Sequence, residues 1–330
     1  MVRGMNRTLR QLSAVGAVLL SLFSLAHAQA PEKWPTRPVR IVVPFPAGGG
    51  TDSIARFLGE RMALELKTSV LIENRPGAGG IIGAQTAANA PADGYTVLLG
   101  SNSTLVSNRF LYSKLPYNPD NFEPIGEVGV QSLVLVVNSS MPVNSLAEFV
   151  AYAKAHPGKV NYASFGQGTT SHLAGEMFKQ TAGIDMVHVP FKGAAEAIPA
   201  LMAGSVDAYF DTIVSSLPHI KSGKFRALGV TTPKRSSAMP SLATIAEQGY
   251  PGFEMYPWYG VTVLKATPKD VQQKLRTALA TSLADPELRR RLTESGTEVN
   301  YADAPEFATL IRNDSVNIEK LVKSVGITVQ

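Results

Sequence analysis

Short runs of β-branched residues alternate with helical patterns along most of the chain, and this alternation restricts the possible folds more than any other feature. The runs at 39–45, 69–76 and 95–103 are separated by a helical pattern at 51–66 and by a glycine-rich turn that leads into another helix. Within 51–66 the apolar residues recur every three or four positions, which places them on one buried face. Regular alternation of strand and helix indicates βαβ units, so we expect a parallel sheet covered by helices.

A second series of strands and helices begins near residue 131. No low-complexity linker separates the two series, and 330 residues with 45% apolar content are enough for two cores. We therefore predict two α/β lobes joined by chain crossings that can bend as hinges. One lobe is expected to contain residues 29–130 and 250–330, and the other residues 131–249.

The N-terminal segment has the composition of a secretory signal peptide. The first ten residues carry three arginines and no acid, and an apolar run of about fifteen residues follows. This run is too short to span a bilayer comfortably. It ends at Ala26-His27-Ala28, a pattern typical of signal peptidase cleavage. We expect cleavage after Ala28, at the end of residues 1–28, and export of residues 29–330 to the periplasm of a Gram-negative cell; a retained membrane anchor is the alternative.

The composition excludes several classes of protein. The chain has no cysteine, which excludes disulfides, a thiolate nucleophile, a cysteine-bound metal and a lipid-modified N-terminal cysteine. The signal segment holds three of the 31 Lys and Arg residues and no acid, which leaves 28 basic against 26 acidic residues. The basic cluster Arg289-Arg290-Arg291 lies in a helical pattern beside Glu287 and Glu294, so we interpret it as a solvated helix face. We expect no nucleic-acid partner.

A glycine-rich loop between the first strand and the first helix is the strongest local signal for a ligand site. Gly48, Gly49 and Gly50 let the backbone turn tightly and approach a ligand, and the free N–H groups of the first helical turn point at it with the positive end of the helix dipole. Such a helix N-terminus favours an anion. Thr51 or Asp52 can cap this helix, and Asp52 either serves as cap and dipole partner or contacts the ligand.

Two further glycine-rich loops follow strands and precede helices. The glycines at 77, 79, 80 and 83 do not match G-x-G-x-x-G, because the third falls one residue late, so a dinucleotide site is poorly supported. We expect a second backbone-lined loop beside the first. The loop at 166–172 belongs to the other lobe and carries Thr169, Thr170 and Ser171 at a helix start. A carboxylate could therefore be held from both lobes at once.

Catalysis, metal binding and nucleotide hydrolysis have weaker support. Ser171 and His172 are adjacent, but no G-x-S-x-G occurs and neighbouring helical residues point apart, so we read His172 as packing or a polar ligand contact. The histidines after residue 28 lack metal-ligand spacing, and no G-K-[ST] follows a glycine loop. We expect no enzyme activity, no metal and no cofactor.

Some residues have two open interpretations. Asp207 and Asp211 lie four positions apart on one face of a strand-like stretch. Either one of them meets a ligand ammonium or tethers the lobes, or they serve as solvated or capping acids. The aromatic run of Tyr256, Trp258 and Tyr259 either lines a cleft or belongs to the core.

Eight motifs follow one another along residues 34–330: PFPAGGGTD, ENRPGAGG, DGYTVLLG, GKVNYASFGQGTTSHLAGE, VPFKGAAEAIPALMAG, VDAYFDT, GKFRALGVTT and PWYGVTVLKATP. In this combination and order the chain resembles the Bug family, also called tripartite tricarboxylate transporter receptors. The resemblance implies a type II periplasmic-binding-protein fold, in which two α/β lobes close on a ligand cleft, and ligands that are organic acids or acidic amino acids.

The resemblance also implies ligand-binding residues, to which the loop argument adds Gly49. These are Phe45, Ala47, Gly48 and Asp52 after the first strand, Gly79 and Gly80 through ordered waters, Thr169, Thr170, Ser171 and His172 in the second lobe, and Asp211. Phe191 stands where the family often has tyrosine, which could remove a hydroxyl from the pocket.

We therefore expect a monomeric periplasmic protein that binds a small carboxylate and presents its closed form to the membrane subunits of a transporter. One alternative is a ligand sensor that feeds a membrane kinase, and another is an exported α/β hydrolase that uses Ser171 and His172 or Asp52. Lys192 is the nearest candidate for a second carboxylate, whereas Trp258 with Phe45 would suit an aromatic acid. The sequence does not choose between these ligands.

Overall fold

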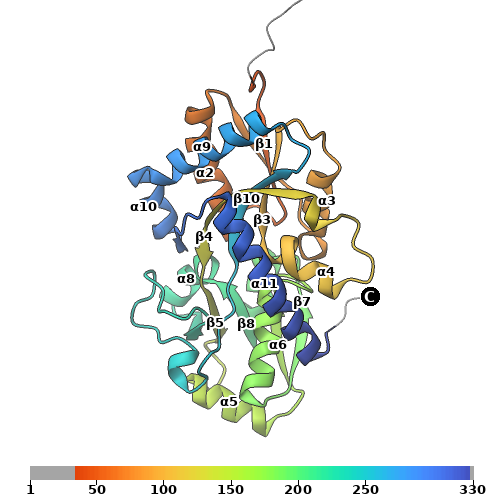
Figure 1. Cartoon of the computed structure of the whole chain (residues 1–330). Coiled ribbons are helices and arrows are strands. Elements are labelled where there is room, and N and C mark those ends of the chain that lie inside the picture. The colour runs from red at the N-terminus through yellow and green to blue at the C-terminus, as the bar shows by residue number, and fades with distance from the viewer. Residues whose placement is uncertain (1–33, 328–330) are drawn as a thin grey trace, which may run out of the picture. The chain divides into compact units, whose positions relative to one another are not determined.

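The computed structural model describes residues 34–327, of which the residues from Arg37 onward form one compact unit (Figure 1). The expected signal peptide and its cleavage site lie outside the described residues. This unit contains two β-sheets, each with helices packed against it. No helix within residues 34–327 is long and apolar enough to cross a membrane.

The first sheet has six strands in the order β11-β4-β10-β3-β1-β2. Its strands are β1 (Val39–Val43), β2 (Val70–Asn74), β3 (Thr96–Ser101), β4 (Phe122–Gln131), β10 (Trp258–Leu264) and β11 (Thr297–Glu298). Its helices are α2 (Gly50–Leu66), α3 (Ile81–Ala88), α4 (Asn108–Leu111), α9 (Lys269–Ala284), α10 (Pro286–Glu294) and α11 (Ala304–Val325). The three strands β1, β2 and β3 are parallel, as the βαβ pattern predicts, whereas β10 is antiparallel to β3 and to β4.

The second sheet has five strands in the order β7-β6-β8-β5-β9. Its strands are β5 (Leu133–Asn138), β6 (Val160–Ser164), β7 (Met186–Pro190), β8 (Ala208–Thr212) and β9 (Phe225–Val230). Its helices are α5 (Leu146–Ala155), α6 (Thr170–Ala182), α7 (Ala194–Met202) and α8 (Ile213–Lys221). Strand β6 is parallel to β7 and β8, and β5 is antiparallel to β8 and β9. Both sheets are therefore mixed rather than purely parallel.

The chain crosses between the sheets at two neighbouring places. A single residue, Ser132, separates β4 in the first sheet from β5 in the second, and the chain returns between β9 and β10. The Ser132 and Thr232 hydroxyls are hydrogen-bonded at 3.2 Å, and the N–H of Gln131 donates to the carbonyl of Pro257 at 3.0 Å. These bonds hold the two crossings side by side. The lobe boundaries at 130/131 and 249/250 stay a prediction.

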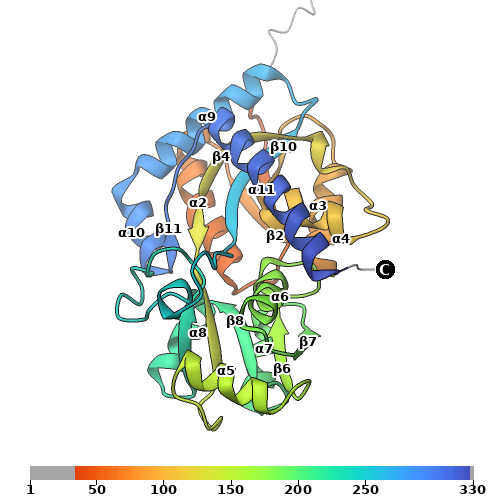
Figure 2. The ribbon, with the colours of Figure 1, turned by 60° about the horizontal axis from the view of Figure 1, so that its bottom comes forward.

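Helix α11 packs across the first sheet and also contacts α6, so it links structure from both sheets (Figure 2). Phe307 is fully buried and meets the Trp258 ring edge-on at 5.4 Å between ring centroids. The indole N–H of Trp258 in β10 donates to Asp314 of α11 at 2.9 Å. This hydrogen bond attaches α11 to the sheet at a second point, beyond Phe307. Gly260 of β10 provides the space for the Phe307 ring, because a side chain at this position would overlap the ring.

Candidate functional site

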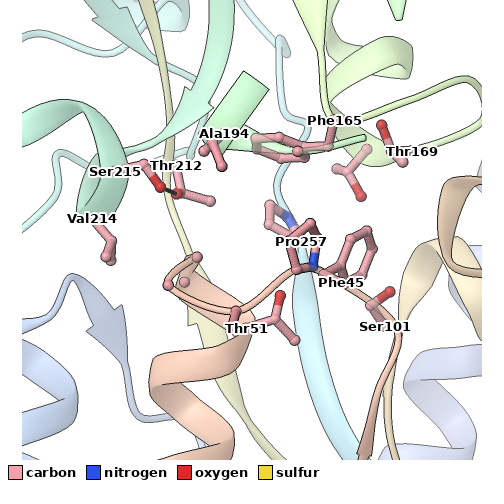
Figure 3. Close-up of a pocket in the computed structure, with 18 of the residues that line it drawn as sticks. Phe45, Thr51, Ser101, Phe165, Thr169, Ala194, Thr212, Val214, Ser215 and Pro257 are labelled. Atoms are coloured by element: carbon pink, nitrogen blue, oxygen red, sulfur yellow. Dashed lines mark hydrogen bonds between the residues drawn. The ribbon is translucent and has the colours of Figure 1, made fainter. Parts of the chain in front are cut away.

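A cavity of about 360 Å³ lies where the ends of strands from both sheets meet. We call it the interlobe cavity. Phe45, Phe165 and Pro257 form part of its walls (Figure 3). The described residues that line it are Phe45, Pro46, Ala47, Gly48, Gly49, Gly50, Thr51, Ser101, Ser103, Phe165, Thr169, Thr170, Gly193, Ala194, Ala195, Ile198, Thr212, Val214, Ser215, Pro218, Pro257 and Tyr259. This volume falls within the range of small-molecule binding sites.

Four helices begin at the interlobe cavity. The residues that precede α2, α6, α7 and α8 all line it, and none of their side chains caps the following helix: Gly49, Thr169, Gly193 and Thr212. The first-turn N–H groups of a helix have no partner within the helix, and they carry the positive end of its dipole. The cavity is therefore surrounded by backbone donors from both lobes and is suited to an anion.

Within residues 34–327, no charged side chain lines the interlobe cavity. Its polar side chains are hydroxyls, and the rest of its wall is glycine, proline and apolar side chains. In such surroundings the effective dielectric is lower than that of water, so backbone dipoles act more strongly on a bound charge. The site can bind an anion without a lysine or arginine in contact with it.

Asp52 organises the loop after β1 instead of lining the cavity. Its carboxylate accepts from the N–H of Gly48 at 2.9 Å, from Nε of Arg56 at 2.9 Å and from Nδ2 of Asn74 at 3.0 Å. Burial alone would raise the pKa of Asp52, but these hydrogen bonds outweigh it and hold the pKa below its usual value. The prediction that Thr51 or Asp52 caps α2 is wrong, because Gly49 is the N-cap and has no side chain to accept a bond. Asp52 does lie in the first turn of α2, where its charge opposes the positive end of the helix dipole, as predicted.

The N–H of Gly48 is therefore already used by Asp52. Gly48 lines the cavity together with the predicted residues Phe45, Ala47 and Gly49. Gly48 has a φ of 82°, which favours glycine at this turn.

Gly79 and Gly80 lie apart from the interlobe cavity. They line a second cavity of about 420 Å³, which shares Phe45 and Phe165 with the first. A side chain at Gly79 would meet the carbonyl of Gln167 in the opposite lobe, so this glycine allows the two loops to pack closely. Lys192 and Phe191 also line the second cavity, and Lys192 pairs with Glu196. The structure does not bring Lys192 to the interlobe cavity.

The loop before α6 contributes Thr169 and Thr170 to the interlobe cavity, but not Ser171 or His172. The Ser171 hydroxyl donates to the carbonyl of Phe210, and Nδ1 of His172 accepts from the N–H of Gly168 at 3.2 Å. The His172 ring stacks on His188 at 3.9 Å between ring centroids. Burial lowers the pKa of His172 to about 4, so this ring is neutral at pH 7. Both residues support the loop, and they do not form a nucleophile and base.

Asp211 is fully buried at the end of β8, behind the start of α8. Its carboxylate accepts from the N–H of Thr212 at 2.8 Å and from the Ser216 hydroxyl at 2.6 Å, and it does not line the cavity. Burial raises its pKa to about 7, although the two hydrogen bonds oppose this shift. Asp207 lies before β8, where it accepts from the N–H of Asn161 at 2.7 Å.

The raised pKa of Asp211 predicts how stability depends on pH. An acid with a higher pKa in the folded state favours folding most below its unfolded pKa, and this contribution is lost as pH rises through the folded pKa. The unfolding free energy of the wild type should therefore fall, relative to Asp211→Asn, by at least about 1 kcal/mol between pH 4 and pH 7.5. Urea denaturation of both proteins across this range measures the difference. Parallel pH profiles would contradict the prediction.

Of the aromatic run Tyr256, Trp258 and Tyr259, one residue lines the cavity and another belongs to the core. Tyr259 lines the interlobe cavity and donates to Oε1 of Gln131 at 3.3 Å. Trp258 belongs to the core beneath α11, and Tyr256 does not line the cavity. An aromatic ligand would therefore meet Phe45 and Phe165 rather than Trp258.

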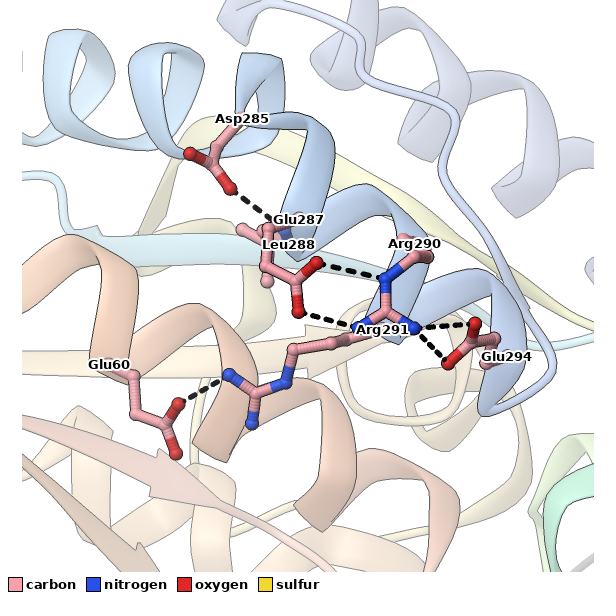
Figure 4. Close-up of polar contacts among 7 residues, drawn as sticks. All are labelled: Glu60, Asp285, Glu287, Leu288, Arg290, Arg291 and Glu294. Atoms are coloured by element: carbon pink, nitrogen blue, oxygen red, sulfur yellow. Dashed lines mark hydrogen bonds and ion pairs between the residues drawn. The ribbon is translucent and has the colours of Figure 1, made fainter.

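Two of the three arginines in the cluster on α10 are paired with acids. Arg290 binds Glu287 and Glu294 on its own helix, each at 2.7 Å, and Arg291 binds Glu60 of α2 at 2.6 Å (Figure 4). The guanidinium of Arg291 also lies 4.2 Å from the centre of the Phe57 ring. These contacts agree with the interpretation of a solvated helix face.

Comparison with known proteins identifies the family. The family model described as tripartite tricarboxylate transporter family receptor matches residues 54–327. Protein BugT of Bordetella pertussis is 37% identical over 265 residues, which cover 80% of this chain and 81% of BugT. Rpa4515 of R. palustris, solved with adipate, has 35% identity and a TM-score of 0.86, and the match covers 89% of this chain and 99% of that one.

MatC from Rhodopseudomonas palustris, solved with bound malate, has 33% identity and a TM-score of 0.81, and the match covers 88% of this chain and all of MatC. These similarities confirm the predicted periplasmic-binding-protein fold with two α/β lobes. They also confirm that the function is binding and not catalysis. The chain belongs to the Bug family of tripartite tricarboxylate transporter receptors, which are solute-binding proteins.

Proposed function

We propose that this receptor captures a small organic carboxylate in the interlobe cavity and delivers it to the membrane subunits of a tripartite tricarboxylate transporter. The observation that carries the proposal is the convergence of four uncapped helix N-termini on a cavity without charged side chains. Backbone N–H groups in this arrangement recognise an anion. Adipate and malate, with which two relatives were solved, are both carboxylates.

Direct bonds between the lobes support capture by closure. The Thr170 hydroxyl donates to Oδ1 of Asn102 at 2.7 Å, and the Tyr112 hydroxyl donates to the carbonyl of Gln167 at 3.2 Å. Thr170 also lines the cavity, so the same loop contacts the opposite lobe and faces the ligand. A ligand that bridges the lobes stabilises this closed arrangement by its greater affinity for it.

We further propose that residues 1–28 direct export and that the receptor acts in the periplasm as a monomer. The composition of the N-terminal segment and the family membership support this location.

A thermal-shift screen of residues 29–330 tests the proposed function. We expect at least one mono-, di- or tricarboxylate or acidic amino acid to raise Tm by roughly 5 °C or more at 100 times its Kd. The matched control is the uncharged amide of each acid at the same concentration. Absence of stabilisation by every acid tested would contradict carboxylate binding.

A further inference from the structure

The two ends of the interlobe cavity differ in the charge behind them. Figure 3 shows Thr169, at the start of α6, toward one end, and Val214 and Ser215, at the start of α8, toward the other. Helix α6 has no acid in its first turn. The start of α8 instead follows directly on Asp211, whose buried carboxylate accepts from the N–H of Thr212. A ligand carboxylate at α8 would lie near this acid, whereas at α6 it meets a helix dipole that no first-turn acid offsets.

The other two helices that begin at the cavity carry acids of their own. Asp52 lies in the first turn of α2, where Arg56 pairs with it at 2.9 Å, and Glu196 lies in the first turn of α7. An acid in the first turn partly offsets the positive end of a helix dipole. Of the four helix starts, that of α6 is therefore the best place for the ligand carboxylate.

The faces that α7 and α8 turn toward the cavity are apolar. Ala194 and Ile198 are four residues apart on α7, and so lie on one face of that helix. Val214 and Pro218 have the same spacing on α8. All four side chains line the cavity, and the protein itself buries none of them completely. A ligand that covers this apolar surface gains binding free energy from removing it from water.

Two phenylalanines extend the apolar surface, one from each lobe. Phe45 follows β1 and Phe165 follows β6, and both line the cavity (Figure 3). The ring of Tyr209 meets the Phe165 ring edge-on at 5.7 Å between ring centroids, which helps to hold Phe165 in place. The body of a bound ligand therefore contacts apolar side chains of both lobes.

A second carboxylate at the α8 end would have too few partners. The hydroxyls of Thr212 and Ser215 share one hydrogen bond at 3.1 Å, which leaves one of the two O–H groups to donate. One donor suits a neutral oxygen, whereas a carboxylate has about four acceptor sites. The first-turn N–H groups of α8 are offset by the charge of Asp211. Among residues 34–327, no lysine or arginine lines this cavity, and Lys192 lines the second cavity instead. Burying a charge there is therefore costly.

We propose that the ligand is a monocarboxylate with an apolar body. Its carboxylate lies at the start of α6, and its body contacts Phe45 and Phe165. Its uncharged end packs against Ile198 and Val214. The proposal rests on the proposed function and narrows the class of acid that the receptor binds. Adipate and malate, with which two relatives were solved, each have two carboxylates, so the proposal assigns this receptor a different class of ligand.

Pairs of acids with the same carbon skeleton test the proposal: hexanoate with adipate, butyrate with succinate, and 4-methylbenzoate with terephthalate. In each pair the second acid has a carboxylate where the first has a methyl group. Calorimetry on the wild-type protein at pH 8, where all these acids are ionised, gives the dissociation constants. In the pair that binds most tightly, Kd of the monocarboxylate should be at least about tenfold lower than that of the dicarboxylate.

A lysine at the apolar end should reverse this preference. Ile198→Lys supplies a cation for a second carboxylate, so the dicarboxylate of that pair should bind about tenfold more tightly than it binds the wild type. The matched control is Ile82→Lys, because Ile82 is 47% exposed on α3 and does not line the cavity. It should leave both dissociation constants unchanged. Equal losses of affinity for both acids in Ile198→Lys would contradict the proposed contact. Should this variant fail to fold, Pro218→Lys, at an exposed position that also lines the cavity, must produce the reversal.

The outcomes separate the inference from the proposed function. If a dicarboxylate, a tricarboxylate or an acidic amino acid binds the wild type as tightly as the best monocarboxylate, the inference is overturned and the proposed function stands. If no acid binds, the proposed function fails and the inference fails with it.

Discussion

Aspartate in place of Thr169 is expected to weaken carboxylate binding by roughly 100-fold or more, whereas asparagine should change the affinity only a few-fold. Thr169 is the N-cap of α6, is 1% exposed and lines the interlobe cavity. Aspartate and asparagine are both favoured at this position of a helix, so each should preserve the start of α6. They have nearly the same shape and differ in charge.

The expected loss has an electrostatic cause. Two like charges about 4 Å apart repel by about 4 kcal/mol at the effective dielectric near a protein surface. Calorimetric titration of both variants with the same acid measures the effect. Equal affinities for the aspartate and asparagine variants would show that the ligand carboxylate does not lie at α6.

Gly260→Val is expected to destabilise the fold by about 3 kcal/mol, near the upper end for an overpacked core. A side chain at Gly260 would overlap three atoms of the Phe307 ring, which is fully buried between β10 and α11. The ring cannot move freely, because it also packs against Trp258. Urea denaturation gives the change in unfolding free energy.

A double-mutant cycle checks this cause. Phe307→Ala alone should cost about 3–5 kcal/mol, because it leaves a cavity in the core. In the Gly260→Val background the smaller side chain makes room for valine, so the double variant should be at least about 1 kcal/mol more stable than the sum of the single effects predicts. Additive effects would mean that Gly260→Val acts through the strand and not through Phe307.

The parts of the fold that depend on local pattern could be predicted from the sequence. The runs at 39–45, 69–76 and 95–103 became β1, β2 and β3, and the pattern at 51–66 became α2. Strand β4 was not predicted, because Pro124, Gly126 and Gly129 interrupt its apolar pattern. The first sheet is mixed because β10, distant in sequence, pairs antiparallel with both β3 and β4. Such long-range pairing leaves no periodic signal in either segment.

In the candidate site, too, the residues next to a clear local pattern could be predicted and the others could not. Gly49 and Thr169 were predicted to be near the ligand because they precede helices with a clear pattern, and both line the cavity. Helix α8 was not predicted, since Pro218 lies inside it and it begins with the β-branched Ile213 and Val214. Thr212 and Ser215 were therefore missed, and no local signal marked Ser101 at the end of β3.

The residues that were predicted as ligands but do not line the interlobe cavity have a common explanation. Asp52, Ser171, His172 and Asp211 are polar side chains at the ends of strands or starts of helices, which is also where ligand contacts occur. Their partners, such as Asn74 for Asp52 and Phe210 O for Ser171, lie far away in the sequence. Only the folded arrangement shows that these groups hold the binding loops in place.

We propose that helix N-termini, without a charged side chain, bind the negative charge of the ligand carboxylate. Calorimetric titration of residues 29–330 with the best acid from the thermal-shift screen, and then with its uncharged amide, measures how much this charge contributes to the affinity. The amide, which has nearly the same shape, is expected to bind at least about 100-fold more weakly, because it lacks the charge that the N–H groups recognise. Equal affinity for the acid and the amide would contradict binding of the charge by the helix N-termini.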